Sequence, residues 1–470
     1  MGEVVEMIPI PIPMKEASVN MQDYFEDVGR FTKIDPDQDA WLPITESRNG
    51  NTYHSAFHTL SSGIGIQALL LPLAFTALGW IWGILCLLLV FVWQLYTIWL
   101  LIQLHEWMPG VRYSRYLHLA KAAFGEKQGK LLVIFPIMYL SGGTCVGLIT
   151  LGGGTMKFFV EFACGGGCIA KPLTTVEWYL VFTCSAILVA QLPNLNSIAG
   201  VSLIGAISAL GYCTLVWVVS ISKDRPPDVS LNQKSDTARI WAILNALGII
   251  ALTFRGHNLV LEIQGTMPSS PKQPSRVPMW RGVQVAYLLI SMCLFPLATV
   301  GYWAYGNLVT ANGGMLNAMF KYHANDTSRF LKGLTSLLVV INSLSSFQIY
   351  AMPVFDNLEF IYTSTKNKPC PRWVRSGFRA FFGCLTFFIA VAIPFLGGLA
   401  GLIGGIALPV TLAYPCFMWI VIKKPQQYSA MWYLNWGLGC LGMLLSVLII
   451  VGAVWSLVDP GIKICFFKTQ

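Results

Sequence analysis

Apolar stretches long enough to cross a lipid bilayer follow one another along this chain, and they restrict it to very few folds. A transmembrane helix needs about 20 apolar residues, and inside lipid only a helix or a closed barrel satisfies its own backbone. Hydrophobic residues fill 55% of the 470 positions and charged residues only 11%, against roughly a quarter in soluble proteins. The sequence therefore predicts an all-α polytopic membrane protein. The eleven predicted spans are 53–78, 81–104, 131–159, 177–193, 197–221, 240–265, 283–305, 330–361, 377–396, 399–422 and 432–458.

The two ends of the chain differ from this apolar middle. Ten of the 22 acidic residues fall between Glu3 and Glu46, before the first span. This start lacks the basic residues and short apolar core of a signal peptide, and its composition predicts a disordered tail over residues 1–52. Residues 53–458 form the predicted transmembrane domain, and residues 459–470 a short tail after it.

Basic residues indicate the side of the membrane on which each loop lies. With a cytoplasmic N-terminus, the inside segments carry 19 Lys and Arg residues and the outside segments 11, while Arg255 is intramembrane. This excess follows the positive-inside rule, which accounts for the net charge of +9 without a nucleic-acid partner. The inside loop 105–130 mixes aromatic and basic residues, which predicts a short amphipathic helix on the inner surface.

Two outside features agree with this orientation. Asn325 begins an Asn-Asp-Thr sequon, so it is a candidate glycosylation site. Cys164 and Cys168 flank three glycines in an outside loop, where an oxidising compartment permits a disulfide. The C-terminal tail, after the eleventh span, would be extracellular.

The sixth span contains polar groups that lipid cannot satisfy. Arg255, Gly256, His257 and Glu262 fall within one apolar stretch, so they should face a protein or water-lined cavity. His257 would contact substrate or carry protons, or else be a neutral helix contact. Glu262 is either a proton acceptor or one half of a permanent ion pair. Arg255, seven residues earlier, either neutralises Glu262 or faces an anionic group of a substrate.

The first span is interrupted as well. Residues 61–65 read Ser-Ser-Gly-Ile-Gly, which weakens a helix and frees backbone amides and carbonyls. Amides at a half-helix N-terminus favour a substrate carboxylate, and unwound carbonyls favour an amine. The alternative is that these small residues only allow close helix packing. Two interruptions, in spans one and six, occupy matching positions of two five-helix halves and predict an inverted repeat.

Polar residues in spans three and eight would complete a central site, or would hold helices together. Asp356 and Glu359, near the inner end of span eight, are expected to be solvated. The candidate substrate-binding residues are Ser61, Ser62, Gly63, Ile64, Gly65, Thr144, Arg255, His257 and Ser345, and the candidate proton-coupling residues are His257 and Glu262.

Several motifs closely resemble those of the plant lysine/histidine transporter-like amino acid permeases, a branch of the amino acid/auxin permease family. The most specific is the Gly-His-Asn-Leu-Val-Leu-Glu-Ile-Gln stretch at 256–264. Others are Gln-Leu-Pro-Asn at 191–194 and Gly-Tyr-Trp-Ala-Tyr-Gly-Asn at 301–307. The resemblance covers residues 40–468, nearly the whole chain.

This resemblance implies eleven helices in a LeuT-like 5+5 inverted repeat, and proton-driven import of amino acids across the plasma membrane. The proton gradient would be the driving force, with no cofactor. The family's substrate region would map onto residues 61–66 and His257. Better-known members have a small residue before Gly-His, where this chain has Arg255. A fixed cation there either repels lysine-like side chains and favours neutral or acidic substrates, or pairs with Glu262.

The prediction is therefore a proton-coupled symporter that imports amino acids by alternating access. Its partners would be a small amino-acid substrate, protons and the lipid bilayer, with no nucleic acid and no obligate protein partner. Two alternatives stay open, a carrier of auxin-like or other organic acids and a nutrient receptor that transports little. An internal membrane is the alternative location. The sequence contains no nucleotide loop, catalytic triad or metal constellation, so no enzyme activity is expected.

Overall fold

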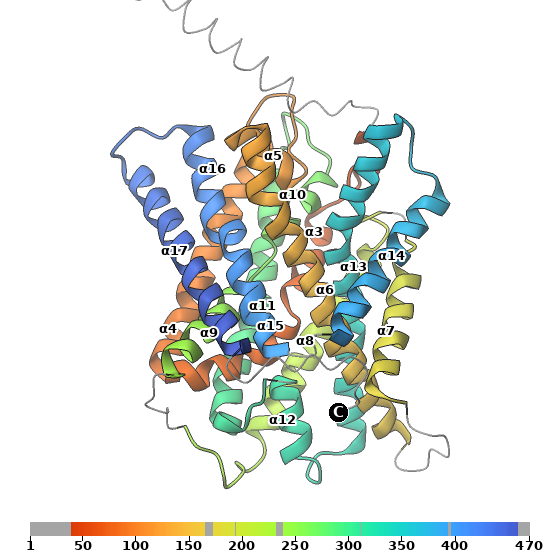
Figure 1. Cartoon of the computed structure of the whole chain (residues 1–470), viewed down its shortest axis with the longest axis vertical. Helices are drawn as coiled ribbons and strands as arrows, with labels where there is room; N and C mark the ends of the chain where they lie inside the picture. The colour runs from red at the N-terminus through yellow and green to blue at the C-terminus, as the bar shows by residue number, and fades with distance from the viewer. Residues whose placement is uncertain are drawn as a thin grey trace, which may run out of the picture.

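The computed structural model describes residues 39–164, 173–192, 194–231, 238–311, 313–392 and 396–458. The helices run between one end of the molecule, where α5 lies, and an opposite end, where α12 lies (Figure 1). We call these the α5 end and the α12 end. The helices are α3 (Thr52–Gly63), α4 (Ile66–Leu104), α5 (Tyr116–Phe124), α6 (Glu126–Cys164), α7 (Thr175–Val189), α8 (Ala199–Ile221), α9 (Ala238–Ala251), α10 (His257–Gly265), α11 (Arg276–Tyr305), η1 (Gly306–Leu308), α12 (Gly314–Tyr322), α13 (Arg329–Lys366), α14 (Arg372–Ala392), α15 (Leu396–Leu408), η2 (Pro409–Ala413), α16 (Tyr414–Lys423) and α17 (Ala430–Val458).

The predicted crossings can be followed in this list. Eight helices in the described parts of the chain are long and apolar enough to cross a membrane. One of them, α4, contains two predicted spans, because Gly79 has a φ of 76° and divides it at a bend. The shorter α7 and the consecutive pair α9 and α10 complete the eleven predicted crossings. The short α5, whose apolar side packs against α6, is the predicted amphipathic helix.

Both predicted interruptions are present. Helix α3 ends at Gly63, Ile64 is extended with φ −114° and ψ 123°, and α4 begins at Ile66. The second interruption separates α9 from α10, where Phe254 has a φ of 52° and Gly256 a φ of 147°. Glycine adopts the latter conformation without a steric penalty, which explains why it precedes His257.

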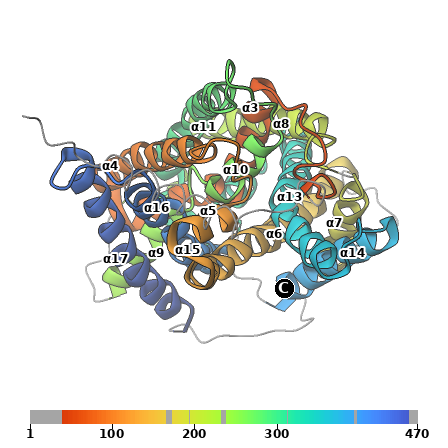
Figure 2. The same cartoon turned by 90° about the horizontal axis from the view of Figure 1, so that it is seen from above.

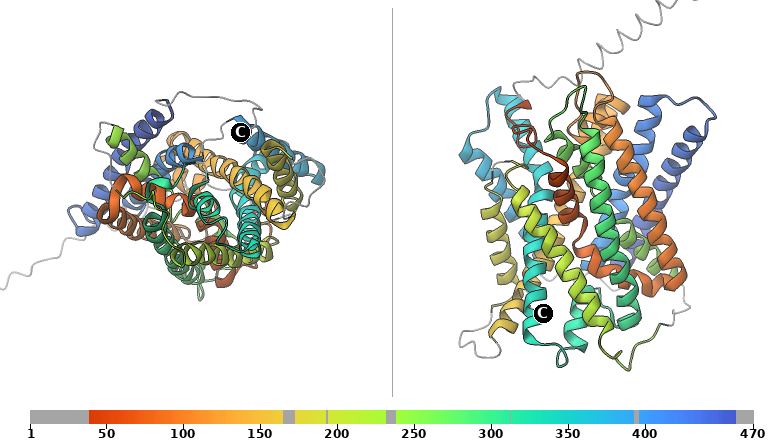
Figure 3. Two further views of the ribbon diagram at one scale, coloured as in Figure 1. Left: turned by 90° about the horizontal axis from the view of Figure 1, so that it is seen from below. Right: turned by 180° about the vertical axis from the view of Figure 1, so that it is seen from behind.

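The interruptions lie in the middle of the bundle. Seen from above, α10 is surrounded by α3, α4, α6, α11 and α13, while α7 and α14 flank one side and α9 and α17 the other (Figure 2). Helices α8 and α11 pack against α3 along the back of the molecule (Figure 3). The outer helices carry exposed apolar side chains, such as Phe388 on α14 and Val447 on α17, as expected of surfaces that face lipid.

The four basic-rich connections that were predicted to share one side of the membrane do lie together. The chain turns at the α5 end between α4 and α5, α10 and α11, α13 and α14, and α16 and α17 (Figure 1). Asn325 lies between α12 and α13, at the opposite end. Cys164 is the last residue of α6, whereas Cys168 lies outside the described residues, so their disulfide stays a prediction.

Part of the predicted tail belongs to the packed protein. Residues 1–38 are outside the described residues, but Leu42 and Ile44 are fully buried. The Gly50 amide donates to the Thr266 carbonyl, just beyond α10, over 2.9 Å. The packed domain therefore begins before residue 53, the predicted boundary.

Candidate functional site

Helix α13 satisfies the backbone of the first interruption. The Ser346 hydroxyl donates to the Ser61 carbonyl over 2.6 Å, and the Tyr350 hydroxyl donates to the Ser62 carbonyl over 3.0 Å. The hydroxyls of Ser61 and Ser345 lie 3.0 Å apart. The structure thus brings together the polar residues that the sequence predicted in spans one and eight.

Other side chains satisfy carbonyls that the interruptions release. The Gln67 amide donates to the Gly63 carbonyl over 2.7 Å, and the Gln94 amide donates to the Ala251 carbonyl over 2.7 Å. The Tyr287 hydroxyl donates to the Phe254 carbonyl. These carbonyls, which we expected to hold a substrate amine, therefore already accept a hydrogen bond from the protein.

Arg255 occupies the centre of this region and is 1% exposed. Its Nη1 donates to the Thr144 hydroxyl of α6 over 3.1 Å, and its Cζ lies 4.6 Å from the centre of the Tyr350 ring. A Cβ atom placed on Gly65 would lie 3.3 Å from its Nη2. The Nε and Nη2 groups are buried and have no hydrogen-bond partner. Among the described residues, no carboxylate lies within ion-pair distance of this guanidinium.

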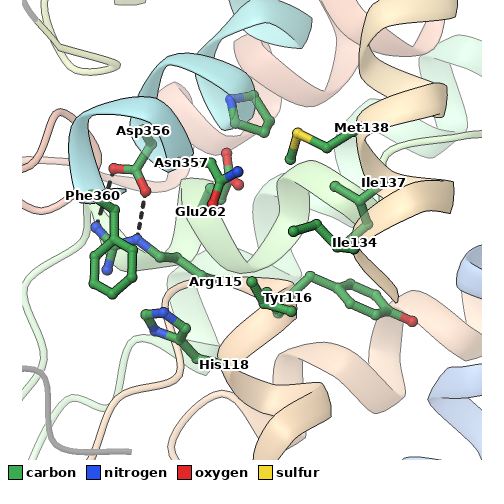
Figure 4. A pocket seen from close by; sticks show the side chains of 12 residues that line it. Arg115, Tyr116, His118, Ile134, Ile137, Met138, Glu262, Asp356, Asn357 and Phe360 are labelled. Carbon is green, nitrogen blue, oxygen red and sulfur yellow. Dashed lines mark hydrogen bonds and ion pairs between the residues drawn. The ribbon is translucent and has the colours of Figure 1, made fainter. Parts of the chain in front are cut away.

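Glu262 lies in a separate cavity on α10 rather than beside Arg255. The residue is 6% exposed, and its Oε2 has no hydrogen-bond partner. Arg115 and Asp356 lie on one side of this cavity and Ile137 and Met138 on the other, with Glu262 between them (Figure 4). Within the cavity, the volume that the centre of a water molecule can occupy is about 40 Å³. This is room for roughly two to four waters and too little for an amino acid.

An ion-pair cluster lines one side of this cavity. Arg115 binds Asp356 of α13 through two hydrogen bonds of 2.5 and 3.1 Å, and binds Asp39 over 2.9 Å. We call these three residues the Arg115 bridge. Burial opposes ionisation of Asp39, but the guanidinium groups of Arg115 and Arg48 hold the pKa of its carboxyl below the ordinary value of 3.8. The Asp39 carboxylate of the Arg115 bridge therefore stays charged at neutral pH.

The two acidic residues expected to be solvated are buried instead. Asp356 and Glu359 are 2% and 1% exposed. Glu359 lies 3.0 Å from Arg375, which also lies 3.6 Å from Glu46 of the predicted tail. That expectation was wrong because the segment from residue 39 onward, together with the start of α14, covers the end of α13.

His257 is held by a different helix from Arg255. Its Nε2 lies 2.8 Å from the Thr97 hydroxyl of α4, and its Nδ1 is buried without a partner. The neighbouring Asn258 donates to the Ser141 hydroxyl of α6 over 3.1 Å. His257 and Arg255 therefore contact different helices. The contact of His257 with substrate stays a prediction.

A buried polar site between two interrupted helices, inside a bundle of membrane crossings, defines the chain as a membrane transporter rather than an enzyme. The sequence profile of the family described as "Transmembrane amino acid transporter protein" matches residues 48–455, and the chain belongs to this family. A similar relative is "Lysine histidine transporter-like 8" of Arabidopsis thaliana, which is 58% identical over 98% of this chain and 89% of the relative. The predicted resemblance to the plant lysine/histidine transporter-like permeases is confirmed.

Solved structures show the same fold. MhsT in complex with L-phenylalanine superposes with a TM-score of 0.55 at 11% identity, covering 87% of this chain and 99% of that chain. A substrate-bound, outward-open Na⁺-coupled sialic acid symporter superposes with a TM-score of 0.52 at 11% identity, covering 93% and 97%. The predicted LeuT-like architecture is therefore confirmed.

Proposed function

We propose that this protein is a proton-coupled symporter that imports amino acids by alternating access around the two interruptions. The observation that carries the proposal is the position of Glu262, buried in a water-sized cavity with one carboxylate oxygen unpaired. An ionisable side chain inside a membrane protein that lacks a permanent partner is a candidate for a proton relay. Glu262 would carry the proton, and the interruptions would hold the substrate.

The Arg115 bridge supports alternating access. It connects α13 to the start of α5 and to the segment before α3. Opening of the α5 end would require these ion pairs to separate, while the central site lies deeper in the bundle. Binding of substrate and proton would therefore be coupled to a rearrangement of α3, α5 and α13.

The placement of basic residues supports import across the plasma membrane. The four connections at the α5 end and the N-terminal tail carry the predicted excess of Lys and Arg, so the α5 end would be cytoplasmic. The sequon at Asn325 would then face the outside. Protons that enter from an acidic exterior would leave through the cavity of Glu262.

One observation also favours an organic acid as substrate. Arg255 has two free donors and no counter-ion among the described residues, which suits an acid that lacks an amine. This carrier remains the second candidate, and it would use the same central site. Competition between amino acids and acids without an amine separates the two.

The test is uptake of radiolabelled amino acids by cells that express the protein, at mildly acidic and mildly alkaline external pH. The wild type is compared with Glu262→Gln and with the control Glu126→Gln, whose carboxylate is half-exposed in a surface pair with Lys121. We expect faster uptake at acidic pH, abolished by a proton uncoupler and by Glu262→Gln but unchanged in the control. Absence of uptake by protein at the cell surface would refute amino-acid transport and leave the organic-acid carrier and the nutrient receptor as the alternatives.

A further inference from the structure

We propose that Arg255 makes the central site selective for amino acids of net negative charge, whose second carboxylate it binds. The inference rests on the proposed function, because it assigns a substrate class to the same transport site. It predicts that glutamate and aspartate are preferred to their amides and to cationic amino acids.

The first step of the argument is the way in which Arg255 is held. Thr144 accepts from Nη1, and the Tyr350 ring covers one face of the guanidinium, while the Tyr350 hydroxyl is itself fixed on the Ser62 carbonyl. The two donors left free, Nε and Nη2, form one edge of the planar group. That edge matches the spacing of two carboxylate oxygens, so a carboxylate can accept both hydrogen bonds at once.

The second step is the charge balance at the site. A buried cation without a counter-ion is unfavourable, and the described residues place no carboxylate within ion-pair distance of Arg255. A zwitterionic substrate adds no net charge and leaves this cation uncompensated. A substrate of net charge minus one neutralises it, whereas a lysine-like substrate would add a second positive charge.

The third step is the set of groups next to Arg255. Gln67 Oε1 is a buried acceptor without a partner, and it lies 3.3 Å from the position of a Cβ on Gly65, the same distance as Arg255 Nη2. Gly65 is also the residue before α4, whose N-terminus has no side-chain cap. An acceptor, a cation and the amides of a helix start thus converge on one glycine. We assign the substrate amine to Gln67, one carboxylate to the start of α4 and the other to Arg255.

The test compares glutamate with glutamine, two substrates of nearly equal size that differ by one charge. Uptake of each radiolabelled compound is measured in the wild type, Arg255→Gln and Arg255→Lys, and is normalised to protein at the cell surface. We expect the wild type to prefer glutamate, and Arg255→Gln to lower the ratio of glutamate to glutamine uptake by about 10- to 100-fold. Arg255→Lys should lie between them, because it keeps the charge but loses the planar fork. A ratio that Arg255→Gln leaves unchanged overturns the proposal.

A binding measurement keeps the inference separate from the proposed function. The thermal midpoint of the purified wild-type protein is recorded with glutamate, glutamine, lysine and succinate. Stabilisation by glutamate well above the other three supports the proposed substrate class even if no proton-driven uptake is found. Equal or stronger stabilisation by glutamine or lysine contradicts it. Stronger stabilisation by succinate, which has two carboxylates and no amine, contradicts the role of Gln67 and favours the organic-acid carrier.

Discussion

Arg255 lies in the interruption between α9 and α10, and Glu262 lies on α10, yet the two side chains have different surroundings. Arg255 contacts Thr144 of α6 and the ring of Tyr350 on α13, while Glu262 lines the cavity next to the Arg115 bridge. The sequence left open whether the two residues neutralise one another, and the structure shows no ion pair between them. The separation gives one buried cation and one buried carboxylate, so substrate and proton are assigned to different places.

The Arg115 bridge should be important for the closed α5 end. Arg115→Gln leaves the carboxylate of Asp356 buried without its partner, and breaking a buried pair in this way costs about 3–5 kcal/mol. We expect a clearly lower thermal midpoint for the purified protein and slower net uptake. Lys121→Gln, which removes a partly exposed pair with Glu126 worth at most about 1 kcal/mol, is the matched control. Equal midpoints for the two variants would show that the bridge does not stabilise this conformation.

Asp39 of the Arg115 bridge should not contribute to the pH dependence of uptake. Because the pKa of Asp39 is held below 3.8 in the folded protein, its stabilising contribution is complete above that value and is lost only as the pH falls through the still lower folded pKa. Uptake by Asp39→Asn at several external pH values checks this. We expect a lower rate with the same pH profile as the wild type, whereas a profile shifted between mildly acidic and neutral pH would contradict the assignment.

A methyl group at position 65 should interfere with substrate. The Cβ of Gly65→Ala would lie 3.3 Å from both Arg255 Nη2 and Gln67 Oε1, close enough to fill the space but loose enough for the neighbours to adjust. We expect uptake to fall by about tenfold or more with normal surface expression. Gly142→Ala on α6, which meets no atom within 4 Å, is the control and should keep uptake. Wild-type uptake by Gly65→Ala would remove this position from the site.

The second interruption should depend on glycine for its backbone rather than for space. At Gly256 the φ is 147°, but an added Cβ would meet only Ile98, at 4.0 Å. Gly256→Ala should therefore lower the stability of the protein by about 1–3 kcal/mol through backbone strain alone. A reduced thermal midpoint, compared with that of Gly142→Ala, is the expected result. An unchanged midpoint would mean that the chain at this position adapts freely to an alanine.

Hydropathy predicted the crossings well, because the need to satisfy the backbone inside lipid leaves few choices. The same reasoning located both interruptions, since Gly63 and Gly65 or an intramembrane Arg255 are unfavourable in a lipid-facing helix. It also separated the first two spans at residues 79–80, where Gly79 bends α4 between its two crossings.

The contacts of the site could not be predicted from the sequence, for a different reason. Arg115, Asp356 and Asp39 come from three distant segments, and each is an ordinary charged residue near a predicted membrane boundary. Whether Arg255 and Glu262 lie together was undetermined because the interruption removes the helical periodicity that relates residues seven apart. In both cases tertiary packing, and not a local pattern, decides which groups lie together.

The most direct test of the central claim is amino-acid uptake by purified protein in liposomes, with an imposed proton gradient and simultaneous recording of internal pH. We predict that the substrate accumulates only when the gradient is present, that its entry acidifies the interior, and that Glu262→Gln loses both effects while Glu126→Gln keeps them. Accumulation that is independent of the proton gradient, or coupled proton entry that persists in Glu262→Gln, would contradict the account.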